Sequence, residues 1–93
     1  MTLVGTWRKT TSSECDRQYP DEIEFRETRF LARKGADQGF IVWDAGGYEV
    51  LGPGTIKIDT ASDEQVHYRF TSSDDVLTFV DSAGCEFRYR RVA

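Results

Sequence analysis

The sequence contains very little histidine and cysteine, the residues on which most zinc sites and many catalytic sites depend. His67 is the only histidine among 93 residues, and Cys15 and Cys85 are the only cysteines. A cluster of histidines for zinc is therefore excluded, and a metal site built from these three residues is a weak alternative. A Gly-x-Ser-x-Gly motif is also missing, and His67 has no serine or carboxylate partner in strand phase. The sequence therefore indicates no catalytic residue, no metal site and no cofactor.

Long apolar runs and an excess of basic residues are missing as well. No apolar stretch approaches the ~18 residues of a membrane-spanning helix, and the start of the chain does not show the basic and then apolar pattern of a signal peptide. The 12 basic residues are outnumbered by 16 acidic ones, which argues against a nucleic-acid partner because phosphates require a basic surface. We expect a soluble cytoplasmic protein without a membrane span, unless the chain is the mature part of a secreted precursor.

Aromatic residues, by contrast, are abundant. The chain has two Trp, four Tyr and six Phe residues, and each can bury roughly 150–250 Å² in a folded core. A chain of this length forms one domain, here residues 1–93, and a domain this small has few layers in its core. We therefore expect a core dominated by aromatic rings.

Alternation of apolar and polar residues is the main secondary-structure signal. Ile23 and Phe25 alternate with acidic neighbours, which is typical of a half-buried strand. The same alternation occurs over residues 3–11, 65–71 and 85–91. A helix over residues 21–34 is the competing interpretation, but the apolar residues there do not share a helical face well.

Short turns rich in glycine, serine and aspartate separate these segments. The run 40–43 is β-branched and aromatic, which predicts a strand. Residues 44–47 predict a hairpin turn before a returning strand at 48–50. The segment 52–54 predicts a second tight turn, and not a phosphate-binding loop, because it links two strands. The sequence therefore predicts an all-β fold: an antiparallel up-and-down meander of about eight short strands that close into a small barrel.

Closure of such a barrel requires the first strand to pair with the last, since this removes both exposed edges. We expect Trp7 to be buried and to contact the last strand through Tyr89 or Arg91. Antiparallel pairing then brings Cys15, just past the end of the first strand, beside Cys85 at the start of the last. The two cysteines form a disulfide in an oxidising compartment and stay as thiols in a reducing cytoplasm, and both states remain open.

The motif Gly5-Thr6-Trp7 on the first strand, the meander and an arginine near the end of the last strand resemble the lipocalin-like, or calycin, barrels. This resemblance implies that Trp7 plugs the closed end of the barrel. It also implies that a late arginine packs across the indole, which is Arg91 by strand phase or Arg90 if the register slips by one residue. Gly5 and Trp7 thus have structural roles in this interpretation.

Further segments extend the resemblance over most of the chain. Residues 43–44, 77–79 and 84–89 are similar to small lipocalin-like bacterial proteins without an assigned activity. The family usually encloses a ligand, and an eight-strand barrel is just wide enough to be filled by its own side chains or to hold one small molecule.

Two functions of different classes follow. The first is a binding module, without catalysis, in which Trp43, Tyr48, Tyr68 and Phe70 hold a small apolar or aromatic ligand. The alternative is a structural or protein-interaction domain with a filled core that forms a homodimer. An enzyme that uses the barrel as its active-site cup has the least support, because no acid–base pair is apparent in the sequence.

Overall fold

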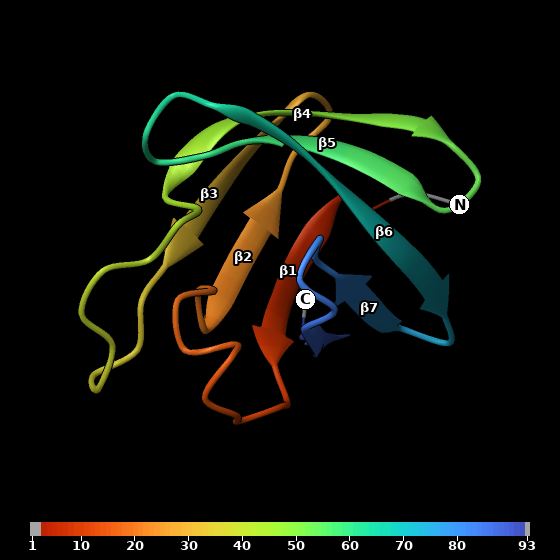
Figure 1. Cartoon of the computed structure of the whole chain (residues 1–93). Helices are drawn as coiled ribbons and strands as arrows, with labels where there is room; N and C mark the ends of the chain where they lie inside the picture. Colours follow the sequence, from red (N-terminus) through yellow and green to blue (C-terminus); the bar gives the residue numbers. More distant parts are fainter. Residues whose placement is uncertain (1–2, 93) are drawn as a thin grey trace.

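The computed structural model describes residues 3–92, which form a closed antiparallel barrel (Figure 1). The strands are β1 (Gly5–Lys9), β2 (Glu22–Phe25), β3 (Arg29–Arg33), β4 (Ala45–Gly52), β5 (Thr55–Asp59), β6 (Gln65–Ser73), β7 (Val76–Val80) and β8 (Glu86–Arg91). Each strand pairs with the next one in sequence, so the predicted all-β meander is confirmed. These residues include no helix, and hence none that is long and apolar enough to cross a membrane.

The barrel closes where β1 pairs with β8. Trp7 lies opposite Arg91, and Lys9 lies opposite Tyr89. Gly5 begins β1 with a φ of 140°, a conformation that side-chain-bearing residues rarely adopt. The predicted pairing of the first and last strands is therefore confirmed, and the architecture is compatible with a lipocalin-like fold.

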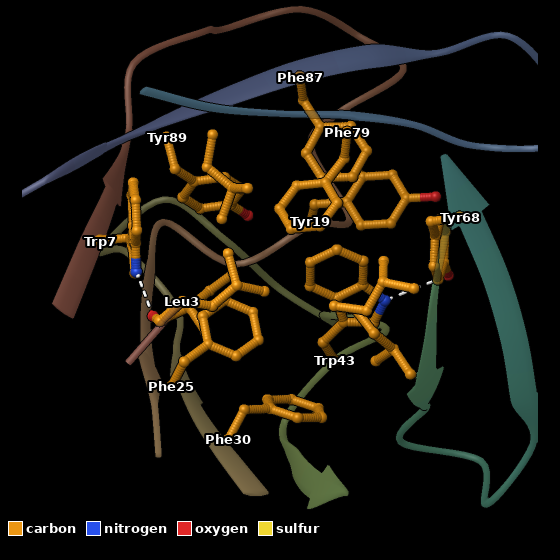
Figure 2. Packing of buried hydrophobic residues seen from close by; sticks show 14 of the residues in the cluster. Leu3, Trp7, Tyr19, Phe25, Phe30, Trp43, Tyr68, Phe79, Phe87 and Tyr89 are labelled. Carbon is orange, nitrogen blue, oxygen red and sulfur yellow. Dashed lines mark hydrogen bonds between the residues drawn. The ribbon is translucent and has the colours of Figure 1, made fainter. Parts of the chain in front are cut away.

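Inward-facing residues of the strands fill the barrel with aromatic and branched side chains (Figure 2). The largest fully buried apolar side chains are Trp7, Trp43, Tyr89, Phe25, Phe79, Phe87, Ile23, Ile56, Ile58 and Leu77. The strands contribute alternate residues to this set because side chains on a strand point to opposite faces in turn. Within β8, for example, Phe87 and Tyr89 are buried whereas Glu86 and Arg88 are exposed.

The predicted strand at residues 40–43 is wrong. This run is a loop in which Phe40 is 69% exposed, whereas Trp43 is fully buried. The backbone of Val42 bonds to two other loops: its N–H donates to the Gln18 carbonyl at 2.8 Å, and its carbonyl accepts from the Ala61 N–H at 2.7 Å. The apolar character of this run therefore reflects a loop from which Trp43 enters the core and Val42 packs against it.

The predicted hairpin turn at residues 44–47 is also wrong, because β4 begins at Ala45 and includes both glycines. A Cβ atom on Gly46 would lie 3.0 Å from the Cβ atom of Asp59, and one on Gly47 would lie 3.1 Å from the Asp59 Oδ2 atom. The Gly47 N–H donates to this oxygen at 3.1 Å. These glycines thus allow the backbone of β4 to lie close to Asp59, and they do not reverse the chain.

Candidate ligand-binding groove

The four aromatic residues predicted to bind a ligand lie in two different environments. Trp43 and Tyr68 are inside the packed core, where the indole Nε1 donates to the Tyr68 hydroxyl at 3.1 Å. Their ring centroids are 5.1 Å apart in an edge-to-face arrangement, and Phe79 and Tyr19 pack against the Trp43 ring at the same distance. Figure 2 shows these rings in contact across the interior. Trp43 and Tyr68 therefore fill this part of the barrel themselves.

Tyr48 and Phe70 instead line an open groove at one end of the barrel, beside the β2–β3 and β4–β5 turns. The groove has a volume of about 870 Å³, which lies in the range of small-molecule sites. Its apolar lining consists of Leu3, Val4, Tyr48, Val50, Pro53 and Phe70. The groove is therefore the place in the described chain that suits a small apolar molecule.

The groove connects to the core through aromatic contacts. The Tyr48 ring lies 4.9 Å from the Phe25 ring, edge to face, and the Phe70 ring lies 6.5 Å from that of Phe79. Phe25 and Phe79 are fully buried, so the two groove residues rest on rigid supports. A site on supported rings loses little conformational entropy when a ligand binds.

The groove also carries polar side chains, among them that of Tyr48. The Tyr48 hydroxyl donates a short hydrogen bond to the Arg26 carbonyl, and burial, followed by the negative charge of Glu27, raises the pKa of the Tyr48 phenol. Tyr48 is therefore neutral at physiological pH. Because its O–H already donates to the Arg26 carbonyl, the Tyr48 hydroxyl can only accept a hydrogen bond from a ligand.

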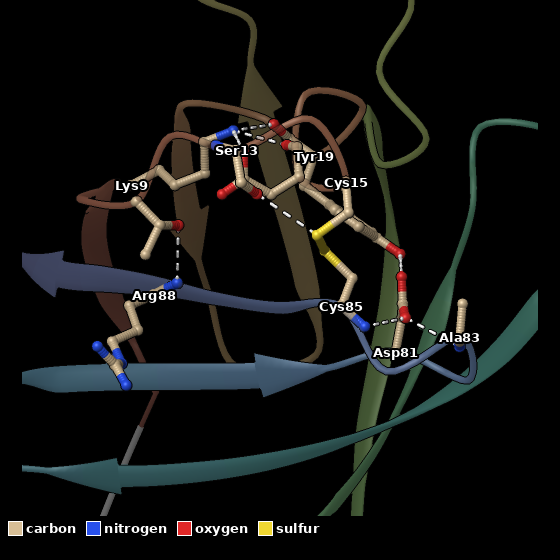
Figure 3. The surroundings of a disulfide bond; sticks show 10 residues. Lys9, Ser13, Cys15, Tyr19, Asp81, Ala83, Cys85 and Arg88 are labelled. Carbon is tan, nitrogen blue, oxygen red and sulfur yellow. Dashed lines mark hydrogen bonds and ion pairs between the residues drawn. A yellow bond between two sulfur atoms is a disulfide. The ribbon is translucent and has the colours of Figure 1, made fainter.

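The opposite end of the barrel is closed by loops and by a disulfide (Figure 3). Cys15 and Cys85 are bonded with a Cα–Cα distance of 5.8 Å, across 70 residues of sequence. The Asp81 carboxylate accepts from the Cys85 N–H at 2.8 Å and from the Tyr19 hydroxyl at 2.7 Å. The strand pairing that predicted neighbouring cysteines thus also brings the first long loop against the start of β8.

That first loop contains a buried ion pair, which the sequence analysis missed because residues 11–18 show only turn formers and charges. The Lys9 ammonium donates to the carbonyls of Asp16 and Tyr19 at 2.8 and 2.9 Å and lies 3.5 Å from the Asp16 carboxylate. Burial alone would raise the pKa of Asp16, but side-chain and backbone hydrogen bonds, followed by the Lys9 charge, hold it below its ordinary value. The only sequence signal that this loop packs against the barrel is the aromatic residue Tyr19. Its ring stacks on that of Phe87, with the ring centroids 3.9 Å apart.

A larger groove of about 1320 Å³ lies at this looped end. Its walls are charged and largely paired: Arg33 contacts Glu22 at 2.7 Å, and Arg8 contacts the same carboxylate at 3.4 Å. An apolar ligand would have to desolvate these ions without replacing their hydrogen bonds, which is unfavourable. This polar groove is therefore a poorer site for an apolar ligand than the groove at Tyr48 and Phe70.

The three residues of the alternative metal site, Cys15, Cys85 and His67, do not form a metal-binding cluster. Cys15 and Cys85 are joined to each other, and His67 is exposed on β6. Within residues 3–92, no group of three or more His, Cys, Asp or Glu side chains is arranged to hold a metal ion.

Comparison with known proteins adds no family. The chain matches no protein-family model, and neither curated proteins nor solved structures give a significant match. The arguments about function therefore rest on the geometry of this chain.

Proposed function

We propose that the protein is a lipocalin-like binding module that holds a small apolar or aromatic molecule at the mouth of its barrel. The observation that carries this proposal is the groove of about 870 Å³ in which Tyr48 and Phe70 lie among aliphatic side chains. Trp43 and Tyr68, which were expected to contact the ligand, lie inside the packed core and do not line the groove.

The solvent exposure of the groove favours the same conclusion. Val4 and Val50, which both line the groove, are 42% and 47% exposed. Burying apolar surface of this kind contributes about 25 cal/mol per Å², so a ligand that covers these side chains gains affinity from them. Exposed apolar residues gathered at one mouth, as here, are typical of a binding surface.

A titration with the uncharged dye N-phenylnaphthylamine tests the proposal. We expect saturable fluorescence enhancement with the native chain and a loss of at least tenfold in affinity for Val50→Arg, which places a charged side chain in the groove. Val92→Arg is the matched control, because Val92 is 46% exposed and does not line the groove. No saturable binding by the native chain, or equal binding by the two variants, would overturn the proposal.

The filled interior favours a second candidate, a protein-interaction domain that dimerises through the same apolar mouth. Trp43, Phe79 and Phe87 occupy space that an enclosing binding protein leaves for its ligand. Light scattering over a range of protein concentrations distinguishes the two. A dimer that Val50→Arg dissociates and Val92→Arg preserves supports this candidate, whereas a monomer at all concentrations removes it.

A further inference from the structure

The charged side chains that line the apolar groove are all acidic. Glu27 and Glu49 are the charged residues that line it, and no lysine or arginine of residues 3–92 does so. Glu49 faces outward on β4 and lies 3.4 Å from the Lys57 ammonium across the sheet. Glu49 is thus paired with Lys57, which leaves Glu27 as the unpaired carboxylate that a ligand would meet.

Glu27 is an exposed residue in the β2–β3 turn. Among residues 3–92 it forms no ion pair. The neighbouring Arg26 directs its guanidinium to Glu24, with an Nε–Oε2 distance of 3.0 Å, and Arg29 does not line the groove. The carboxylate of Glu27 thus has no cation of the described chain bound to it.

The hydrogen-bonding groups of the groove also favour a ligand that donates hydrogen bonds. A carboxylate such as that of Glu27 accepts hydrogen bonds and does not donate them. The Tyr48 hydroxyl donates its hydrogen bond to the Arg26 carbonyl, so toward a ligand its oxygen can only accept one. The hydroxyl groups of Thr28, Thr71 and Ser72 can donate or accept and do not discriminate between ligands.

The aromatic faces favour a positive charge as well. The rings of Tyr48 and Phe70 both line the groove, and the face of an aromatic ring attracts a cation within about 6 Å of its centroid. A ligand that is apolar over most of its surface and carries one ammonium group satisfies the rings, the aliphatic side chains and the acceptors together. A carboxylate on the same ligand would face Glu27, and no lysine or arginine of residues 3–92 lines the groove to pair with it.

From this arrangement we infer that the ligand of the groove is an apolar or aromatic amine in its protonated form, with its body against Tyr48 and Phe70 and its ammonium toward Glu27. This inference rests on the proposed function, since it names the ligand class of the same site. A cation is favoured because the unpaired carboxylate of Glu27, the acceptor oxygen of Tyr48 and the aromatic rings of the groove all attract positive charge.

Three ligands with one ring system test the inference: naphthylethylamine, naphthylethanol and naphthylacetate, each competed against N-phenylnaphthylamine. We expect the amine to bind about tenfold more tightly than the alcohol, as a partly exposed ion pair together with a cation–π contact would give. Naphthylacetate should bind more weakly than the alcohol. The preference for the amine should shrink as salt is raised, because salt screens exposed charges.

Two variants test whether Glu27 causes the preference for the amine. Glu27→Gln should reduce amine affinity about threefold to fivefold and leave the alcohol and the dye unchanged. Glu86→Gln, an exposed glutamate on β8 outside the groove, should change none of the three. An alcohol that binds as tightly as the amine, or a preference for the amine that Glu27→Gln leaves undiminished, overturns the inference while dye binding still supports the proposed function. Failure of the dye itself to bind removes both.

Discussion

The guanidinium of Arg91 lies over the indole of Trp7, with its central carbon 4.4 Å from the ring centroid. Arg91 also donates to the Val4 carbonyl at 2.7 Å and contacts Asp75 at 3.1 Å, and the Trp7 Nε1 donates to the Leu3 carbonyl at 2.9 Å. These contacts join the start of the chain to its last strand. Of the two arginines that the lipocalin resemblance allowed, strand phase therefore selects Arg91.

Replacing Trp7 with alanine should lower the free energy of unfolding by about 3–5 kcal/mol, because it empties a fully buried site at the strand closure. Chemical denaturation followed by circular dichroism measures the change. Arg91→Gln should cost about 1–2 kcal/mol through the lost cation–π contact and hydrogen bonds, whereas Arg90→Gln, on the outward face, should have little effect. A Trp7→Ala variant with a near-native midpoint would contradict this account of the closure.

Removing the disulfide should lower stability by roughly 4 kcal/mol in the chain-entropy model, because it closes a loop of 70 residues. The double variant Cys15→Ala and Cys85→Ala, compared with the oxidised native chain in guanidinium, measures this difference. A reductant should lower the denaturation midpoint of the native chain and leave that of the variant unchanged. Proteolysis without reductant should yield the two cysteines in one linked peptide, and separate unlinked peptides would show that the bond does not form.

The tyrosines should ionise late in the folded protein. Burial is the main cause that raises the pKa of Tyr19, Tyr48, Tyr68 and Tyr89 above the ordinary value of 10.0. A raised pKa means that the folded state holds the proton more tightly, so this contribution to stability is complete below the unfolded pKa and is lost as pH rises above it.

Phenolate absorbance in a pH titration tests this expectation. The native chain should show little phenolate at pH 10 and a steep rise at higher pH as it unfolds. In denaturant, the tyrosines should titrate with a pKa of about 10. Native and denatured titrations that coincide would mean that the tyrosines are exposed to water.

Gly46 should be far less tolerant of a side chain than Gly39. A Cβ atom at residue 46 would lie 3.0 Å from the Asp59 Cβ atom and 3.4 Å from the Asp59 carbonyl oxygen, whereas one at residue 39 meets no atom within 4 Å. We expect Gly46→Ala to destabilise the fold by about 1–3 kcal/mol through overpacking and Gly39→Ala to change stability by less than about 0.5 kcal/mol. Thermal melting of both variants gives the comparison, and equal midpoints would refute the close approach of β4 to Asp59.

Local pattern was sufficient for the fold class and for the closure of the barrel. Alternation with a period of two residues identifies which face of each strand is buried, and short turns make neighbours in sequence neighbours in space. These two properties predicted that Trp7 is buried, that β1 pairs with β8 and that Cys15 lies near Cys85. No knowledge of distant contacts is needed for any of them.

Tertiary structure alone decided how loops and strands share the interior. Residues 40–43 have the composition of a strand, yet their backbone bonds to two loops, and from this loop Trp43 enters the core while Val42 packs against it. Lys9 and Asp16 carry no sequence signal of burial, yet they pair inside the looped end.

The candidate site divides in the same way. The sequence alone determined that aromatic rings line the barrel, because strand phase places Tyr68 and Phe70 on the inward face. Only the three-dimensional packing decided that Trp43 and Tyr68 satisfy each other in the core while Tyr48 and Phe70 remain at the mouth. Whether space remains beside a buried ring depends on side chains distant in sequence, and no local pattern records their combined volume.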